Sequence, residues 1–170
     1  MDLSFGPEYD DFRGEVVTFL ANNADKAPKG GDLRGQQAKD WQKLLIENGY
    51  TCRTIPKEFG GYGAEPDIIK TRIIAEEFSK ARINTGLGGQ GISMLVPTLL
   101  EMGTQEQKEH FIRPTIMGDM IWCQGYSEPG AGSDLAALST AAVLDGDEWV
   151  INGQKIWTST AHIADWIFCL

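Results

Sequence analysis

The sequence has few of the residues from which metal centres and disulfide frameworks are built. Its 170 residues include three cysteines and two histidines. Because the cysteines are far apart and odd in number, they fit the reduced thiols of a cytosolic protein better than disulfides or a zinc site. A lone histidine is more often structural or solvated than catalytic. We therefore expect no metal site and no catalytic histidine among Cys52, Cys123, Cys169, His110 and His162.

Long apolar runs and an excess of basic residues are also absent. No stretch approaches the roughly 20 uninterrupted apolar residues that cross a bilayer. The acidic start MDLSFGPEYDDF contains no signal-peptide core. A formal net charge of −9 provides no basic face for nucleic acid, and an anionic ligand would need local backbone N–H groups or a few Lys and Arg side chains. These absences predict a cytoplasmic protein that binds neither membranes nor nucleic acid.

The chain is long enough and apolar enough to fold around a sizeable core. Hydrophobic residues make up 42% of its 170 residues, a length that fits one large domain or two small ones. The last residues, Asp165 to Leu170, have the composition of a strand and lack a following turn. We therefore expect the sequence to be a fragment of something longer.

Helical patterns dominate up to about residue 120. Apolar residues recur there at helical spacing, and glycine, proline and capping residues separate the repeats. Pro97 is expected to kink the fourth helix. The predicted helices begin at Pro7, at a cap on Asp32, at Pro66, near Ile92 and at a Thr104/Gln107 capping box, and the last four end at Asn48-Gly49, Arg82, Gly103 and Gly118.

Strand-forming residues dominate from Ile121 onward, where β-branched and aromatic residues replace Leu, Lys and Glu. Asp145-Gly146-Asp147 and Asn152-Gly153 are turn signals, of which Asn-Gly is the stronger. The sequence therefore predicts an α+β fold, with an all-α domain over residues 1–120 and the start of an antiparallel β domain over residues 121–170. The predicted strands are Leu138–Leu144, Glu148–Asn152, Gln154–Ser159 and Asp165–Leu170.

The glycine-rich segment SEPGAGSD invites comparison with phosphate-binding loops. It is not a P-loop, because no Gly-Lys-Ser/Thr follows it. It also departs from the G-x-G-x-x-G dinucleotide pattern, because Leu135 stands where the third glycine belongs. Two interpretations remain open, a plain connection between strands and a ligand-binding loop. For the second, Gly130 and Gly132 would let the backbone approach a ligand closely, with Ser127 and Ser133 adding hydroxyls at the rim.

Four segments carry a resemblance to a known family. SEPGAGSD, preceded by IWCQGY, resembles the signature of acyl-CoA dehydrogenases, and INGQKIWTSTAHIADW, residues 151–166, resembles that family's second conserved block. PKEFGGYG and GTQEQKEHFIRP are weaker matches, and together with the helical start of the chain they stand in the family's order. The resemblance covers nearly the whole chain. It implies the family's fold, an all-α N-terminal domain followed by an antiparallel β-barrel-like domain, here truncated.

The resemblance implies that the cofactor is FAD. Gln124, Tyr126 and Ser127 fall on flavin-contacting positions, and Ser127 takes the place of a hydroxyl that bonds the flavin near N1 and O2. Gly132 and Ser133 match the diphosphate end, and Ser133 also neighbours the acyl-CoA substrate. Neutral donors fixed at N1 and O2 favour the reduced flavin, which is anionic there.

The second block supplies the remaining predicted cofactor residues. Trp157 matches an indole packed on one flavin face. A tryptophan in a strand is by itself more often part of a core, and the flanking motif is what favours the cofactor wall. Thr158 stands where the family often has a branched aliphatic residue, and Ser159 matches a hydroxyl that reaches flavin N5.

The reaction implied by the resemblance is α,β-dehydrogenation of an acyl-CoA thioester, with hydride transfer to flavin N5 and electrons passed to an electron-transfer flavoprotein. The reaction needs a carboxylate base. In the family this base lies in a C-terminal helical domain, so we name no catalytic residue in this chain. Family members are commonly tetramers, homo- or hetero-oligomeric.

Two alternatives share these motifs or part of them. Acyl-CoA oxidases and nitroalkane oxidases have the same fold, and oxygen access separates them from dehydrogenases. A non-catalytic subunit of a hetero-oligomeric dehydrogenase is the other alternative. The intact Ser127, Ser133, Trp157 and Ser159 argue against it, because a flavin-free subunit has no need of them.

Two further groups have both a structural and a functional interpretation. Ile92, Leu95 and Val96 form an apolar helix face that fits ordinary core, and by resemblance this region helps to line the acyl-chain cavity. The pair Glu76-Glu77 has the residue type for acid–base chemistry, but a salt-bridged or solvated helix face is the favoured interpretation.

Overall fold

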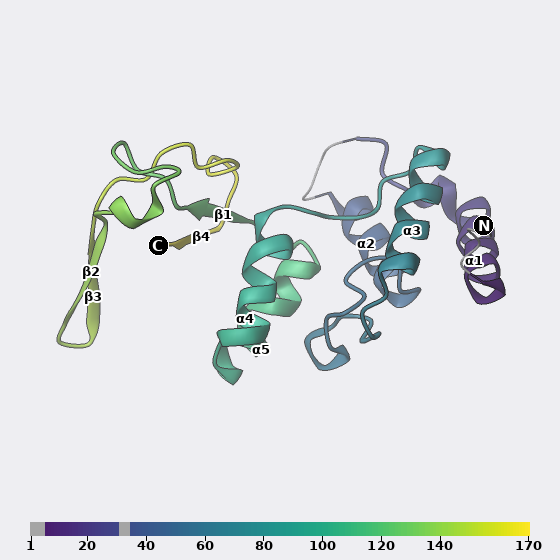
Figure 1. The fold of residues 1–170 in the computed structure, drawn as a ribbon, viewed down its shortest axis with the longest axis horizontal. Helices are drawn as coiled ribbons and strands as arrows, with labels where there is room; N and C mark the ends of the chain where they lie inside the picture. The colour runs from purple at the N-terminus through teal and green to yellow at the C-terminus, as the bar shows by residue number, and fades with distance from the viewer. Residues whose placement is uncertain (1–5, 31–34) are drawn as a thin grey trace.

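The computed structural model describes residues 6–30 and 35–170, with helices in the first two-thirds and strands in the remainder (Figure 1). This confirms the α+β fold class. The predicted cap at Asp32 lies outside the described residues. In the part of the chain that the structure describes, no helix is both long and apolar enough to cross a bilayer. The helices are α1 (Pro7–Asn23), α2 (Gln36–Glu47), α3 (Ile68–Ala81), α4 (Val96–Met102) and α5 (Gln105–Ile116), and the strands are β1 (Trp122–Gly125), β2 (Ala141–Asp145), β3 (Glu148–Asn152) and β4 (Trp166–Cys169).

Side-chain caps fix where two of the helices begin. The Asp67 carboxylate accepts hydrogen bonds from the amides of Ile69 and Lys70, so α3 begins at Ile68 and not at Pro66 as predicted. The capping box that was predicted for α5 is confirmed. Thr104 Oγ1 accepts from the Gln107 amide at 3.2 Å, and the Gln107 side chain accepts from the Thr104 amide at 3.0 Å.

The predicted fourth helix changes its winding halfway. It opens with a π-helical turn over Gly91–Leu95, in which the Val96 amide bonds to the Gly91 carbonyl, and continues as α4. Pro97, which has no N–H to donate, lies just after the change. The irregularity in this helix is a change from π to α winding, and the kink predicted at Pro97 stays a prediction.

Gln42 connects the helices through the core. The α1, α2 and α3 helices share one apolar cluster, and a second cluster holds Ile46 of α2 with residues of α4 and α5. Gln42 is fully buried, donates from Nε2 to the Ile116 carbonyl at 2.7 Å and accepts from the Leu87 amide at 2.8 Å. Gly86 has a φ of +99°, and a Cβ there would lie 2.4 Å from Gln42 Oε1. The joint after α3 therefore needs this glycine and is fixed by this glutamine.

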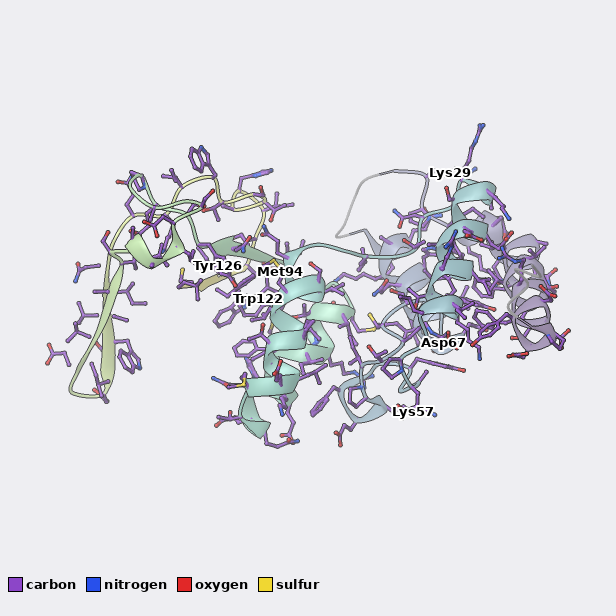
Figure 2. The ribbon with its side chains drawn as sticks, in the orientation of Figure 1. Lys29, Lys57, Asp67, Met94, Trp122 and Tyr126 are labelled. Carbon is purple, nitrogen blue, oxygen red and sulfur yellow. The ribbon has the colours of Figure 1, made fainter. Side chains whose placement is uncertain are left out.

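An aromatic cluster joins the helical part to the strands. Trp122, labelled in Figure 2, is buried at the start of β1, and its Nε1 donates to Thr115 Oγ1 of α5 at 2.8 Å. Phe111 of α5 meets the rings of Trp122 and Trp166 edge-on, and these two indoles stack with centroids 5.6 Å apart. This packing sets where the first strand leaves the helices.

The strands form two separate pairs (Figure 1). β2 and β3 form the expected antiparallel hairpin, closed by Gly146 and Asp147, with Gly146 at a φ of +66°. β1 and β4 are parallel, which the sequence analysis did not foresee. They lie side by side with Trp122 opposite Trp166.

Two strand predictions are corrected. Residues 154–159 form no strand and Asn152-Gly153 is no hairpin turn, because the amide of Ile156 and the side chain of Lys155 bond to residues 126–128. The strand predicted from Leu138 begins only at Ala141. The backbone before it is held by a carboxylate that is described below.

Replacing Gln42 with Ala should lower the free energy of unfolding by about 2–3 kcal/mol, because the Leu87 N–H and the Ile116 carbonyl would lose their buried partner. Denaturant unfolding measures the change. Gln105→Ala is the matched control, since Gln105 is exposed and its side chain bonds to Glu109 of the same helix. We expect less than about 0.5 kcal/mol for it. Equal losses in both variants would contradict the role given to Gln42.

Candidate functional site

The loop after β1 is a tight, self-bonded turn. The Glu128 amide donates to the Ala131 carbonyl at 2.7 Å, and the Ala131 amide returns a bond to the Glu128 carbonyl at 3.1 Å. Glu128 and Ala131 are buried, whereas Pro129 and Gly130 form an exposed tip. Figure 2 labels Tyr126, which lies just beyond β1 at the start of this loop. The loop is therefore well ordered, with its backbone presented outward.

Two glycines of this loop are not required by the chain's own packing. A Cβ added to Gly130 or Gly132 would meet no atom within 4 Å, and neither residue has a positive φ. Side chains there would project into open space in this structure. Small residues at such positions fit a ligand that lies against the backbone. The loop therefore fits the ligand-binding interpretation.

Glu128 is the centre of the site's hydrogen bonding. Its side chain is 3% exposed. It accepts bonds from the Ser139 amide and hydroxyl, both at 2.7 Å, from the Thr140 amide at 2.9 Å and from Lys155 Nζ at 2.8 Å. Lys155, Thr140 and Ser139 together hold the pKa of the Glu128 carboxyl well below its usual value. The loop turns the Glu128 carboxylate inward as a fixed anion.

Lys155 brings the two motif segments together. Its Nζ also donates to the Tyr126 carbonyl at 3.0 Å, and the next amide, Ile156, donates to the Ser127 carbonyl at 2.9 Å. The segments SEPGAGSD and INGQKIW are therefore adjacent, although they are separate in the sequence. The sequence analysis missed Glu128 and Lys155. The signal that could have found them is an acidic residue in one motif and a basic residue in the other, which can pair if the two segments meet.

Trp157 is held in an unusual conformation for its size. It has a φ of +53°, and its side chain is 81% exposed. In an extended chain Lys155 and Trp157 would point to the same side, yet Lys155 is nearly buried. The left-handed backbone at Trp157 breaks this alternation. The result is a flat ring that stands uncovered beside the Ser127–Ile156 hydrogen bond.

The other predicted site residues lie around these two segments. Gln124 is half-buried on β1 and accepts a bond from Gln90 Nε2 at 3.2 Å. Tyr126 is half-buried and meets the ring of Phe168 edge-on. Within the described ranges no side-chain hydrogen bond joins the predicted residues of one segment to those of the other. The exposed members are Gly132, Ser133 and Ser159, whereas Ser127 and Thr158 are half-buried.

A small cavity of about 50 Å³ lies next to this region. Its walls are the glycine-rich joint around Gly88 and Gly89, the end of α5, the start of β1, and Thr160. Gln90 Oε1 is buried without a hydrogen-bond partner among the described residues. Of the apolar residues considered for acyl contact, Ile92 lines the cavity, whereas Leu95 does not and Val96 is buried in the core. The cavity is lined mainly by apolar groups, with Gln90, Thr115 and Thr160 as its polar side chains.

The Glu76-Glu77 pair belongs to a salt-bridged surface, as the favoured interpretation predicted. Arg13 bonds to both carboxylates, Arg72 to Glu76 at 2.8 Å and Lys80 to Glu77 at 2.7 Å. These cations lower the pKa of both carboxyl groups. The pair is therefore engaged in structure and is not placed for acid–base chemistry. Among the residues with described coordinates, no group of three His, Cys, Asp or Glu could hold a metal ion.

Comparison with known families decides the family. Residues 6–119 match the model of the acyl-CoA dehydrogenase N-terminal domain, and residues 123–170 match that of the middle domain. The chain belongs to the acyl-CoA dehydrogenase family. Acyl-CoA dehydrogenase IpdE1 of Mycobacterium tuberculosis is 40% identical over 96% of this chain, which spans 44% of that relative. The short-chain specific acyl-CoA dehydrogenase of Bos taurus mitochondria is 38% identical over 70% of this chain, which spans 29% of that relative.

Solved acyl-CoA dehydrogenase structures have the same fold. The ChsE4-ChsE5 complex from Mycobacterium tuberculosis has a TM-score of 0.71 at 33% identity, over 99% of this chain and 43% of that one. The Tcur3481-Tcur3483 steroid ACAD has a TM-score of 0.70 at 34% identity, over 99% of this chain and 44% of that one. The chain thus spans less than half the length of these relatives and structures.

The lowered pKa of Glu128 predicts an acid-sensitive contribution to stability. The ionised carboxylate stabilises the folded state fully above about pH 5, and this stabilisation is lost as the pH falls below the ordinary carboxyl value of 4.5 toward the depressed folded value. Glu128→Gln should therefore reduce the dependence of unfolding on pH between about pH 5 and pH 3. Denaturant unfolding over this range measures it. Glu101→Gln, on an exposed site of α4, should keep the wild-type slope; an unchanged slope for Glu128→Gln would contradict the assignment.

Proposed function

We propose that this chain is the N-terminal part of an FAD-dependent acyl-CoA dehydrogenase that introduces an α,β double bond into an acyl-CoA thioester. The observation that carries the proposal is the pairing of the two motif segments. Directly before the exposed Trp157, Lys155 donates to the Tyr126 carbonyl and the Glu128 carboxylate, and the Ile156 amide donates to the Ser127 carbonyl. When bound, FAD would supply the hydride acceptor at N5.

The residues of the two segments have separate roles in this proposal. The Trp157 indole covers one face of the flavin and leaves the other face for substrate. The hydroxyls of Ser127 and Ser159 donate to the polar edge of the ring. Gly132 and Ser133 lie at the diphosphate. Small residues and neutral donors would hold the anionic diphosphate against the overall field of a chain whose net charge is −9. Gln124, Tyr126 and Thr158 complete the flavin-contacting set.

The acyl group of the substrate would enter the cavity beside this site. Gln90 lines that cavity and bonds to Gln124, and Thr160 lines it and follows Ser159. The cavity therefore adjoins both segments that are proposed to hold the flavin. Ser133 would also neighbour the acyl-CoA. The names of the matched proteins include steroid, glutaryl-CoA and short-chain acyl-CoA dehydrogenases, so they support the thioester class rather than one acyl group.

We assign no catalytic residue within these 170 residues. Removal of the α-proton needs a carboxylate with a free lone pair facing the substrate. The carboxylate oxygens of Glu128 already accept bonds from Lys155, Ser139 and Thr140. The base is instead proposed to lie in the C-terminal helical domain that the family resemblance implies.

The proposal also covers the electron acceptor, the oligomeric state and the domain boundary of the enzyme. Electrons would pass to an electron-transfer flavoprotein, and the whole protein would be a homo- or hetero-tetramer in the cytoplasm. The two-component name of the ChsE4-ChsE5 complex supports the hetero-oligomeric form. The domain boundary is proposed between residues 120 and 121, in the connection from α5 to β1.

The same two-component names favour one second candidate, a non-catalytic subunit of a hetero-oligomeric dehydrogenase. The exposed Trp157 and the unneeded glycines at 130 and 132 support the flavin-binding role over this candidate. An acyl-CoA oxidase would share all of these features. It differs in how fast oxygen reaches the reduced flavin.

The full-length protein should be yellow, and its flavin absorbance should be bleached when acyl-CoA thioesters are added without oxygen. An electron-transfer flavoprotein should restore the colour faster than air does. Stopped-flow absorbance measures both steps. Rapid recovery in air with release of hydrogen peroxide would identify an oxidase instead. A folded, colourless protein that cannot be reconstituted with FAD would favour the non-catalytic subunit.

Trp157→Ala should weaken FAD binding roughly 10-fold, because stacking on a flat aromatic ring contributes about 1–3 kcal/mol. Trp157→Phe should retain most of the affinity, since it keeps a flat ring at the same position. Equilibrium dialysis of the apoprotein against FAD gives both dissociation constants. An affinity unchanged in Trp157→Ala would remove the indole from the flavin site.

A further inference from the structure

The Glu128–Lys155 ion pair is buried more deeply than its position in a surface loop requires. The Lys155 side chain is 9% exposed and the Glu128 side chain 3%, with Nζ 2.8 Å from Oε1. Lysine and glutamate are rarely buried unless they are paired. The pair therefore connects the loop, the residues before β2 and the segment before Trp157 at one point.

Stability alone does not explain this arrangement. Desolvating two charges costs about as much as their attraction returns, so two well-packed apolar side chains of similar volume often serve as well or better. A charged pair differs in that its donors and acceptors have fixed directions. Lys155 Nζ contacts both Glu128 and the Tyr126 carbonyl, which sets the distance between the two segments. Apolar side chains could fill the space without setting that distance.

We propose that Glu128 and Lys155 are positioning residues that hold the backbone of Tyr126 and Ser127 in register with Trp157, so that a flavin ring fits between them. The inference rests on the function proposed above. Neither side chain touches the flavin in this arrangement, because both are turned inward and their polar atoms bond to each other and to the backbone. Their effect on the cofactor passes through Ser127 and Trp157.

Three variants of the full-length protein test this proposal. Lys155→Met removes the cation and the bond to Tyr126. Glu128→Gln/Lys155→Met removes both charges, so no unpaired ion remains. Lys39→Met is the matched control, since Lys39 forms a 2.6 Å ion pair with Asp119 in the helical part. The readouts are the thermal midpoint of the apoprotein, the FAD dissociation constant and the fluorescence of the bound flavin.

We expect Lys155→Met to weaken FAD binding roughly 10- to 100-fold, as loss of an outer-shell support typically does. The double variant should recover most of the lost thermal midpoint and still bind FAD weakly, with brighter bound-flavin fluorescence because the indole stacks less closely. Lys39→Met should match the wild type in affinity and fluorescence. If Lys155→Met does not fold, the double variant carries the test, because it buries no unpaired charge.

Two results would overturn the proposal. Recovery of FAD affinity together with the thermal midpoint in the double variant would show that the pair only stabilises the fold. Wild-type affinity in Lys155→Met would show that the register does not depend on the lysine. A wild-type apoprotein that binds no FAD at all removes the flavin assignment itself, and this inference with it.

Discussion

The carboxylate of Glu128 is the constraint on which the β part of this structure depends. Three stretches of chain meet at it, namely the loop after β1, the residues that lead into β2 and the segment that carries Lys155. The neighbouring hairpin provides no core against which they could pack, since every residue of β2 and β3 is exposed. Directed hydrogen bonds therefore position the three segments. In a larger domain, a hydrophobic core would have this role.

The helical part supplies the other boundary of the site. Gln42 fixes the joint between α3 and α4 to the end of α5, and Trp122 fixes β1 to the same helix through Thr115. The cavity lies between these two attachments and is lined by Thr115 and Trp122. A ligand at the loop and a ligand in the cavity would thus be placed by one helix. This geometry fits an enzyme in which a cofactor and an acyl group must meet.

The helices could be predicted because their signals are local. The Thr104/Gln107 capping box depends on four consecutive residues, and the structure contains both of its hydrogen bonds. The start of α3 was wrong by two residues, because Pro66 looked like a first-turn proline and the cap is Asp67. The segment 154–159 was predicted as a strand from its composition. Its hydrogen bonds go instead to residues 126–128. These partners are distant in the sequence, so local composition does not predict them.

The site was predicted unevenly for the same reason. The family motifs drew attention to Ser127, Ser133 and Trp157, which are the residues a ligand would touch. Glu128 and Lys155 lie inside the same motifs, yet their importance appears only when the chain folds and their charges meet. The left-handed φ of Trp157 is likewise set by its surroundings, since nothing in a tryptophan favours it.

An experimental structure of the full-length protein, purified with its flavin, tests the central claim most directly. The account predicts an isoalloxazine ring between the Trp157 indole and the backbone of Tyr126 and Ser127, with Lys155 still bonded to Glu128 and to the Tyr126 carbonyl. A flavin bound elsewhere, or one bound here with that ion pair open, would contradict it.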